Sequence, residues 1–495
     1  MVSTGKDTKN FSYLCTMKRK TFHFILLAFL TATLLVSCVD ENYSSSPSDL
    51  LSFSTSKLSM DTTFGATSTW RLMVYNNNQK ALLISSVGLA HGAESSFRIN
   101  VDGRIVPAGT TLHDITVRGN DSIFIMVEAT KPSSQPSDTP FISSDSLVFM
   151  VNGVTQCVGL ELVCRPANIL RSYQLTGDET LTPGTPYLVY DYIYVPEDYI
   201  LTIEAGTEIY MHAAANIIVD GTLNVKGTIG RNVVIRGDRF DDVHDGGSLI
   251  PYLCIPGQWG GIYLQNAQSR HTIEGAQIIG MGAGVILFGA SRANPSLSVR
   301  DSRIHCSSGY GLYAQMADVS VVNSEISNCG LSCLLVVGGT TLVQQSTIVN
   351  HYTFASRDYA AVEVVGFVDN NGRRVAYAVD RFVVENCIIS GGMSQELVMV
   401  YDSTLSSAYN MYVANTLIKG REKNPQFFHS CQYADYNTDI FVRTRADYGK
   451  NPYEYFDFHL SEGSLARGMA DGSVSALYPL ALDGSERDMT TIGAY

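Results

Sequence analysis

The sequence predicts an all-β protein in which an immunoglobulin-like β-sandwich is followed by a right-handed, single-stranded parallel β-helix. Three observations predict this fold. A six-residue phrase returns between residues 270 and 420 at intervals near 22 residues. Strands with glycine corners precede that region, and about seven short strands separated by turn residues come before them. A repeat of this period, with insertions between copies, is typical of a solenoid whose rungs stack on one another.

The repeated phrase reads apolar, any residue, Asn-like, small, any residue, Ile. Its final isoleucines are separated by 26, 22, 22, 41 and 29 residues. We expect the Val and Ile of each copy to face inward and to stack from rung to rung. The six copies are Ile273–Ile278, Val299–Ile304, Val321–Ile326, Val343–Ile348, Val384–Ile389 and Val413–Ile418.

The Asn-like position of the phrase predicts a polar ladder at a turn. Short amide side chains tolerate left-handed backbone and can hydrogen-bond along a stack. The alternative is a row of ligand-binding residues along an exposed groove. This position is occupied by Asp301, Asn323, Gln345, Asn386 and Asn415.

The first 37 residues indicate an export signal rather than a folded element. A basic stretch at 17–20 precedes the apolar run Thr21–Val36, and Leu35-Val36-Ser37-Cys38 is typical of a bacterial lipobox. An uncleaved membrane anchor is the alternative, but a spanning helix needs roughly 20 apolar residues. We therefore expect cleavage before Cys38 and acylation of its thiol, with outer-membrane lipid as the partner. Residues 38–48 then form a polar tether.

Three folded parts follow the tether. Residues 49–165 alternate short strands with hairpin signals such as Asp102-Gly103 and Asn152-Gly153, which predicts the immunoglobulin-like sandwich. Residues 166–425 are the predicted β-helix, where glycines supply the corners between faces of a rung. Residues 426–495 are a predicted C-terminal capping segment.

The chain resembles the right-handed parallel β-helix lipoproteins of Bacteroidetes, which have a pectate-lyase-like fold, over most of its length. The segments that carry the resemblance are Leu201–Thr207, Val219–Leu223, Pro256–Ile262 and Ile492–Tyr495. The resemblance extends to the sandwich, and the acidic pair Asp40-Glu41 behind Cys38 is similar to the tag of surface-exported members. It implies a fold and a place at the cell surface. It implies almost no function, because the fold hosts unrelated activities.

The net charge argues against nucleic acid as a partner. Without residues 1–37 the chain has 29 basic and 46 acidic residues, a net charge of −17. Binding to phosphate backbones needs clustered Lys and Arg, which this chain lacks.

The eight cysteines other than Cys15 and Cys38 form no Cys-x-x-Cys pair, and the histidine spacing gives no zinc pattern. Four of them fall within the repeats: Cys306, Cys329, Cys333 and Cys387. We expect small buried side chains inside the rungs. Disulfides are the alternative in an oxidising compartment.

Parallel β-helices often cleave polysaccharides, but the usual catalytic patterns are missing from this sequence. Of the pectin-hydrolase motifs only Asn437-Thr438-Asp439 occurs, and it follows the repeats. A lyase needs a Ca²⁺ carboxylate cluster and a basic residue facing an acidic sugar. Lys226 and Lys419 are the only lysines between residues 171 and 420.

One acidic loop, residues 238–245, is the best candidate for chemistry, with a solvated structural loop as the alternative. Its carboxylates can bind Ca²⁺ or flank a glycosidic bond as acid and base. The candidate Ca²⁺ ligands are Asp238, Asp241, Asp242 and Asp245. The candidate catalytic residues are Asp241, Asp242 and Arg239.

Two further places are candidates for binding. Trp259 either caps the core or stacks on a sugar ring. Arg373 and Arg374 lie in the insertion His351–Asp380, and insertions on one face of a solenoid often bind ligands.

The leading hypothesis is a cell-surface lipoprotein of the outer membrane that binds or adheres to a glycan or host protein without catalysis or cofactor. The alternative is a polysaccharide lyase or glycoside hydrolase acting at loop 238–245, with Ca²⁺ as its cofactor.

Overall fold

The computed structural model describes most of the chain after residue 41. The described residues are 42–63, 68–129, 141–240, 242–245, 248–266, 269–288, 296–370, 373–405, 408–422, 424–435, 438–444 and 456–495. They are almost entirely β-structure, as predicted, and the chain divides into two compact units that part near residue 161. The predicted lipidation site Cys38 lies outside the described residues. Within the described ranges, no helix is both long and apolar enough to cross a membrane.

The first unit contains two five-stranded sheets with antiparallel pairing, together with the short 3₁₀ turn η1 (Gly92–Glu94). Alternate residues are buried along their central strands, so each sheet has one apolar face. The expected hairpins form at Asp102-Gly103 and Asn152-Gly153, where all four residues have positive φ. One sheet has the order β1 (Ser52–Phe53), β3 (Ser68–Asn76), β8 (Asp121–Ala129), β5 (Phe97–Val101), β6 (Arg104–Val106). The other has the order β2 (Lys57–Thr63), β10 (Val154–Cys164), β9 (Phe141–Val151), β4 (Leu82–Leu89), β7 (Thr111–Val117).

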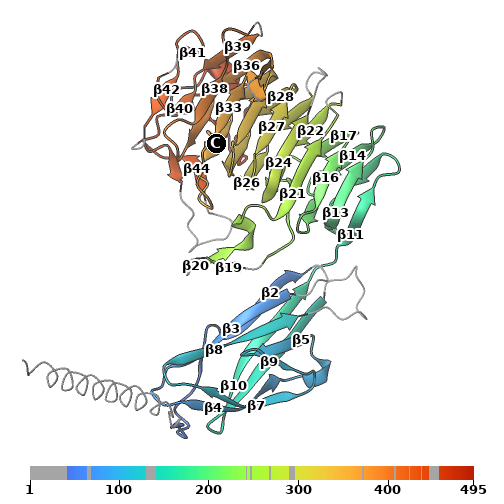
Figure 1. Ribbon diagram of the computed structural model, residues 1–495, viewed down its shortest axis with the longest axis vertical. Coiled ribbons are helices and arrows are strands. Elements are labelled where there is room, and N and C mark those ends of the chain that lie inside the picture. The colour runs from blue at the N-terminus through green and yellow to red at the C-terminus, as the bar shows by residue number, and fades with distance from the viewer. Residues whose placement is uncertain are drawn as a thin grey trace, which may run out of the picture. The chain divides into compact units, whose positions relative to one another are not determined.

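The second unit is a parallel β-helix, visible in Figure 1 as strands stacked side by side from green to orange. Each full rung contributes one strand to a ten-stranded sheet and two strands to an eighteen-stranded sheet. The ten-stranded sheet comprises β12 (Glu179–Leu181), β14 (Ile200–Glu204), β17 (Thr222–Lys226), β22 (His271–Glu274), β25 (Leu297–Arg300), β28 (Asp318–Val322), β31 (Gly339–Gln344), β36 (Val379–Glu385), β39 (Tyr409–Ala414) and β41 (Phe428–His429).

The eighteen-stranded sheet begins with two long strands that pair with each other, β11 (Asn168–Gln174) and β13 (Tyr187–Val195). After them the sheet continues as two rows of parallel strands. The first row comprises β15 (Glu208–Met211), β18 (Val233–Gly237), β23 (Ala276–Ile279), β26 (Arg303–Ser307), β29 (Glu325–Cys329), β32 (Thr347–Asn350), β37 (Ile388–Gly391), β40 (Leu417–Lys419) and β42 (Gln432–Ala434). The second row comprises β16 (Asn216–Val219), β21 (Trp259–Leu264), β24 (Met281–Phe288), β27 (Leu312–Gln315), β30 (Leu334–Val337), β33 (Val362–Val365) and β38 (Leu397–Val400).

The repeated phrase stacks inward, as predicted. Its first apolar residue lies in the ten-stranded sheet and its final isoleucine in the first row, and every one of these side chains is at most 1% exposed. They belong to one continuous apolar core that runs through all the rungs. Cys329, Cys333 and Cys387 lie in that core, which confirms the expectation of small buried cysteines in the rungs. No disulfide joins any of the eight cysteines that the structure describes.

The polar ladder between the ten-stranded sheet and the first row is confirmed. Its five residues all have φ between 47° and 53°. Amide side chains bond along the stack, from Asn323 Nδ2 to Asp301 Oδ1 (2.6 Å) and from Asn386 Nδ2 to Gln345 Oε1 (3.0 Å). Gly275 takes the same place one rung earlier with φ 54°.

The C-terminal segment covers this ladder, so the alternative of an exposed ligand-binding groove there is wrong. Asn323 Nδ2 donates to the carbonyl of Leu480, and Gln345 Nε2 donates to the carbonyls of Thr491 and Gly493. Asn386 binds the start of the short helix α2 (Gly472–Ser475) in the same way.

The C-terminal segment also covers part of the first row. Its apolar side chains pack on Val349, Ile388 and Leu417 of that row. Three antiparallel hairpins complete the unit: β19 (Asp242–Asp245) with β20 (Ser248–Pro251), followed by the 3₁₀ turn η2 (Tyr252–Cys254), then β34 (Phe367–Asn370) with β35 (Arg373–Ala376), and β43 (Phe441–Arg443) with β44 (Asp457–Leu460).

Candidate functional site

The described residues of the acidic loop are engaged with neighbouring side chains. The carboxylate of Asp238 lies 2.7 Å from Nδ1 of His212 on the preceding turn. The guanidinium of Arg239 lies 3.6 Å from the centre of the Tyr252 ring. Both groups therefore help to pack the loop against the end of the rung.

The remaining acidic candidates are placed only in part. Asp242 and Asp245 are the first and last residues of β19, a strand of an antiparallel hairpin, and Asp241 lies outside the described residues. Among the side chains that the structure describes, no group of three His, Cys, Asp or Glu residues is placed to bind a metal ion.

Trp259 is part of the core, and the hypothesis that it stacks on a sugar is wrong. Its side chain is 1% exposed, and its indole Nε1 donates to the carbonyl of Ile279 at 2.8 Å. The residue begins β21, where the chain re-enters the rung after the acidic loop, so it fills the core at that entry point.

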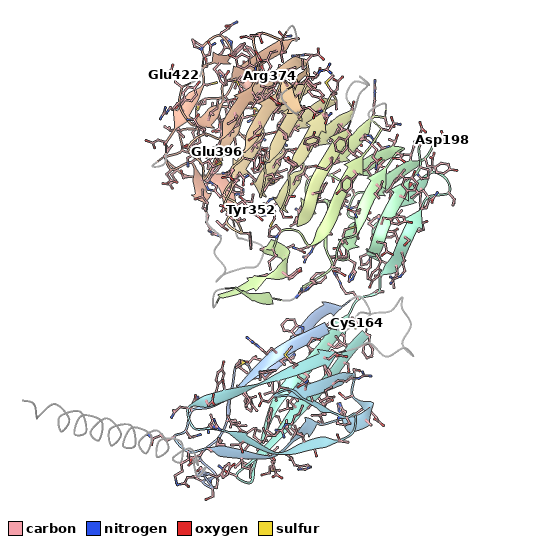
Figure 2. The ribbon with its side chains drawn as sticks, viewed as in Figure 1. Cys164, Asp198, Tyr352, Arg374, Glu396 and Glu422 are labelled. Atoms are coloured by element: carbon pink, nitrogen blue, oxygen red, sulfur yellow. The ribbon has the colours of Figure 1, made fainter. Side chains whose placement is uncertain are left out.

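The arginines of the predicted insertion lie on the exposed hairpin β34–β35. Arg374, labelled in Figure 2, donates to the carboxylate of Asp402, and its guanidinium lies 5.1 Å from the centre of the Phe367 ring. Bonds from Thr404 and from Arg374 lower the pKa of Asp402 to about 2. Arg373 is also exposed. The insertion therefore presents positive charge, but Arg374 is already paired.

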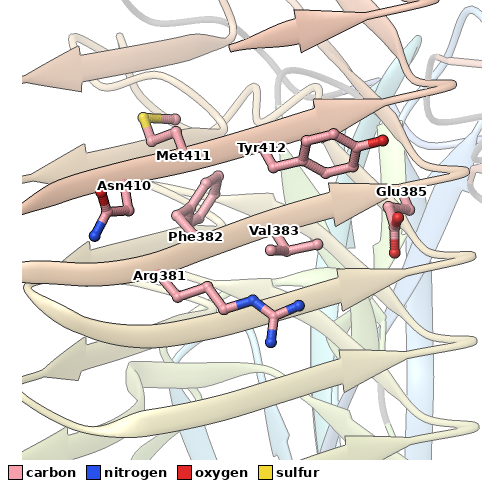
Figure 3. Close-up of a pocket in the computed structure, with 7 residues that line it drawn as sticks. All are labelled: Arg381, Phe382, Val383, Glu385, Asn410, Met411 and Tyr412. Atoms are coloured by element: carbon pink, nitrogen blue, oxygen red, sulfur yellow. The ribbon is translucent and has the colours of Figure 1, made fainter.

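A shallow depression of about 340 Å³ lies on the outward side of the ten-stranded sheet, across β36 and β39 (Figure 3). Arg381 and Glu385 stand at its two ends, with Val383 between them. Tyr412 is 42% exposed, and its ring stacks on that of His429 with centroids 5.0 Å apart. Along the preceding strands the outward residues in register with Val383 and Tyr412 include Thr272, Ser298 and Ser320. The depression therefore offers one aromatic ring rather than an extended track.

A second, polar depression of about 210 Å³ lies beside the C-terminal segment. His459 lines it, with Nδ1 2.6 Å from Asp457 and Nε2 3.2 Å from Asp483. Both ring nitrogens are thus committed to carboxylates, which holds the imidazole in place and leaves neither nitrogen positioned to act on a ligand.

The outward side of the second row carries the feature that best fits a binding site, an apolar stripe that we call the tyrosine face. Backbone pairing places one residue of each successive rung at the same register position. These residues are Tyr194, Ile218, Tyr263, Ile286, Tyr313 and Leu335. The three tyrosines are partly exposed, and so is Ile218 between the first two, whereas Ile286 between the last two and Leu335 after them are buried at 6% and 8% exposure.

Tyrosines occupy every second rung of this stripe. Neighbouring parallel strands are about 4.8 Å apart, so successive tyrosines are about 9.6 Å apart along the helix axis. The strands β16, β21, β24 and β27 that carry or separate them lie in this order in Figure 1. The tyrosines therefore form a regularly spaced row along one face of the β-helix.

Further aromatic and apolar side chains widen the face around Tyr313. The ring of Phe288, which is 47% exposed, lies 5.5 Å from that of Tyr313, and the ring of Tyr310 lies 5.4 Å away on another side. Phe288 begins a second outward column. That column continues with Gln315, Val337, Val365 and Val400.

The tyrosine face carries few charged groups. Over the two outward columns named above Glu363 is the only ionisable residue besides the tyrosines, and burial raises the pKa of that carboxyl. The carboxylate of Asp220 lies at the end of the face, where it accepts a hydrogen bond from Tyr194. Burial likewise raises the pKa of Tyr313, and a hydrogen bond to Asp220 raises that of Tyr194, so these phenols stay neutral at pH 7. Such a surface suits an uncharged, amphipathic ligand.

The comparisons with known proteins concern the fold. Residues 260–420 match the family model described as a right-handed β-helix region, which agrees with the parallel rungs and gives them their hand. No curated protein matches the chain. Among solved structures, the periplasmic chaperone SfaE aligns at 15% identity with a TM-score of 0.17, covering 24% of this chain. The alignment spans 58% of the chaperone, and at that score the likeness supports no inference.

Proposed function

We propose that this protein is a lipid-anchored protein of the bacterial cell surface that binds a glycan chain along its tyrosine face without cleaving it. The observation that carries the proposal is the register of Tyr194, Tyr263 and Tyr313 at every second rung of one face. Tyrosine rings offer an apolar surface to the face of a sugar and a hydroxyl to its edge. A row of them along a rigid solenoid favours a long ligand over a small one.

The surface location rests on the sequence. The lipobox before Cys38 and the tether 38–48 would anchor the folded units to the outer membrane, and the immunoglobulin-like sandwich would act as a spacer between anchor and β-helix. The binding role without catalysis is supported by the composition of the two outward columns, in which Glu363 is the only carboxylate among the described residues and no Lys or Arg occurs, because glycoside hydrolysis needs paired carboxylates at the bond that is cut.

Affinity electrophoresis of the detergent-solubilised full chain in gels that contain neutral or acidic polysaccharides tests the binding role. We expect retardation by a neutral polysaccharide, with no increase in reducing ends after prolonged incubation. Replacing all three tyrosines by alanine should abolish the retardation. Tyr412→Ala, which removes an exposed ring from the other sheet, should not. Release of reducing ends, or retardation unaffected by the triple variant, would contradict the proposal.

Metabolic labelling with a fatty acid tests the anchor separately. The wild-type chain should take up label and sediment with membranes, whereas Cys38→Ala should do neither. Label in the variant would show that lipidation occurs elsewhere, and sedimentation with membranes without label would show that an uncleaved segment holds the chain.

A further inference from the structure

We infer that the ligand of the tyrosine face is an uncharged, β-1,4-linked polysaccharide in its extended, two-fold conformation, with one sugar lying over each rung. This inference rests on the proposed function and names its ligand class. It follows from the alternation of tyrosine and aliphatic residues, from the way the rings are held, and from the charge of the face.

The alternation of tyrosine and aliphatic residues along the face favours a ligand that repeats every second sugar. In an extended β-1,4-linked chain each sugar is rotated by half a turn relative to the one before it, so the same ring face points the same way at every second sugar. Each sugar advances by close to one strand spacing, which is about 4.8 Å. Tyr194, Tyr263 and Tyr313, two rungs apart, would therefore meet equivalent sugar faces. The smaller Ile218 and Ile286 would lie beneath the sugars in between.

Hydrogen bonds hold the outer tyrosines in a similar pose. Tyr313 donates its hydroxyl to Gln315 Oε1 (2.7 Å), two residues further along the same strand. Tyr194 donates to Asp220 Oδ2 (2.6 Å), which follows β16 and so stands two register positions further along the next strand. Both side chains thus lean toward the carboxyl ends of the strands.

The charge of the tyrosine face favours an uncharged polysaccharide over an acidic one. The two outward columns contain no Lys or Arg, and Glu363 would repel a carboxylate. A chain of uronic acids would lose the hydration of its carboxylates without gaining a partner. A polysaccharide that carries only hydroxyl groups has no such penalty.

Titration calorimetry with β-1,4-linked glucose oligosaccharides of increasing length tests the inference. We expect affinity to rise in steps of two sugars, about two- to tenfold for each further tyrosine reached, until the third ring is covered. α-1,4-linked glucose and galacturonate oligosaccharides of equal length should bind at least about tenfold more weakly, because the first has the wrong symmetry and the second the wrong charge.

Variants of the middle ring sharpen the test. Tyr263→Ala should remove one step from the length dependence, while Tyr263→Phe should keep it, because the stacking ring remains. Tyr412→Ala serves as the matched control and should leave every affinity unchanged. An even gain with each added sugar, or equal binding of the α-linked series, would overturn the inference while leaving glycan binding at the tyrosine face intact. Failure of every glycan to bind would overturn both proposals.

Discussion

The two rows of the eighteen-stranded sheet are built from the same rungs, yet their outward faces differ. In the first row, outward residues such as Glu325, Thr347 and Ile388 are at most 1% exposed because the C-terminal segment lies on them. In the second row, tyrosines at the corresponding outward positions remain partly exposed. The full burial of these first-row residues therefore comes from the segment that covers them, since both rows have the same parallel strand pairing.

The covered face of the first row and the uncovered face of the second row also differ in their ionic contacts. On the first row the carboxylate of Glu325 accepts from Arg303 Nε (2.9 Å), Ser327 and the hydroxyl of Tyr495, which ties the C-terminal segment to the rungs. Burial by itself would raise the pKa of Glu325, but Arg303 beside it holds that pKa below its usual range. The second row has no comparable ionic network among its two outward columns. We therefore expect stability to depend on the first face and binding on the second.

The largest effect should come from Glu325→Gln. The substitution leaves the Arg303 guanidinium without its buried counter-charge, which should lower the free energy of unfolding by about 3–5 kcal/mol. Glu363→Gln is the matched control, because it changes an outward glutamate of the second row that pairs with no basic side chain among the described residues, and it should cost less than about 1 kcal/mol. Urea denaturation followed by circular dichroism measures both. Equal losses would mean that the two faces do not differ as described.

The second largest loss of stability should come from a substitution in the polar ladder under the C-terminal segment. Asn386→Ala removes the bonds to Gln345, Asp471 and Ser475 and places alanine at φ 53°, for an expected loss of about 2–4 kcal/mol. Asn386→Gly removes the same bonds but tolerates that φ, so it should cost about 1 kcal/mol less. If the glycine variant were no better than alanine, backbone strain would not contribute at this position.

Acid should weaken the covered side of the β-helix. Burial, with Lys419 and Arg357 nearby, lowers the pKa of His351 to about 4. The unfolded chain therefore takes up a proton at higher pH than the folded chain. Stability should fall as the pH drops from about 6.5 to about 4 and then level off, by at most about 3 kcal/mol from this residue. His271 and His305, whose pKa values burial also lowers, act in the same direction.

Urea midpoints at pH 7 and pH 4.5 measure this loss, with His351→Gln as the comparison. The variant should lose less stability than the wild type over that interval. An identical loss would assign the acid sensitivity to other groups.

The smallest effect on stability should come from the tyrosine face itself. Tyr263→Ala removes cross-strand contacts with Ile218 and Ile286 but leaves the core closed, so the expected loss is about 1 kcal/mol or less. The same variant should weaken glycan binding. A loss as large as that of Glu325→Gln would show that the ring is structural.

The sequence was sufficient to predict the solenoid, its inward residues and its polar ladder, because these depend on a local phrase that each rung repeats. Asn323 and Asn386 at the third position of the phrase predict left-handed turns. Val299 and Ile304 at its two ends predict core positions. The placement of the C-terminal segment depends on contacts such as Gln345 with Thr491, which join residues far apart in the chain and have no local signature.

The tyrosine face was missed for the same reason. Tyr194, Tyr263 and Tyr313 are separated by 69 and 50 residues, and loops of different length hide their common register. The available signal was a bulky apolar residue in the middle of an apolar triplet, as in Ile262-Tyr263-Leu264 and Leu312-Tyr313-Ala314, where alternation requires the middle residue to face outward. The candidate binding residues predicted from the sequence lie instead in the interruptions of the repeat. Trp259, which lies in one of these interruptions, is a core residue.

Hydroxyl-radical footprinting of the full chain, with and without a β-1,4-linked glucose hexasaccharide, identifies the face of the β-helix that binds the ligand. Saturating ligand should protect Tyr194, Tyr263 and Tyr313 from oxidation and should leave Tyr412 of the ten-stranded sheet unchanged. Binding accompanied by protection of Tyr412, with the three tyrosines of the second row oxidised as before, would contradict the account.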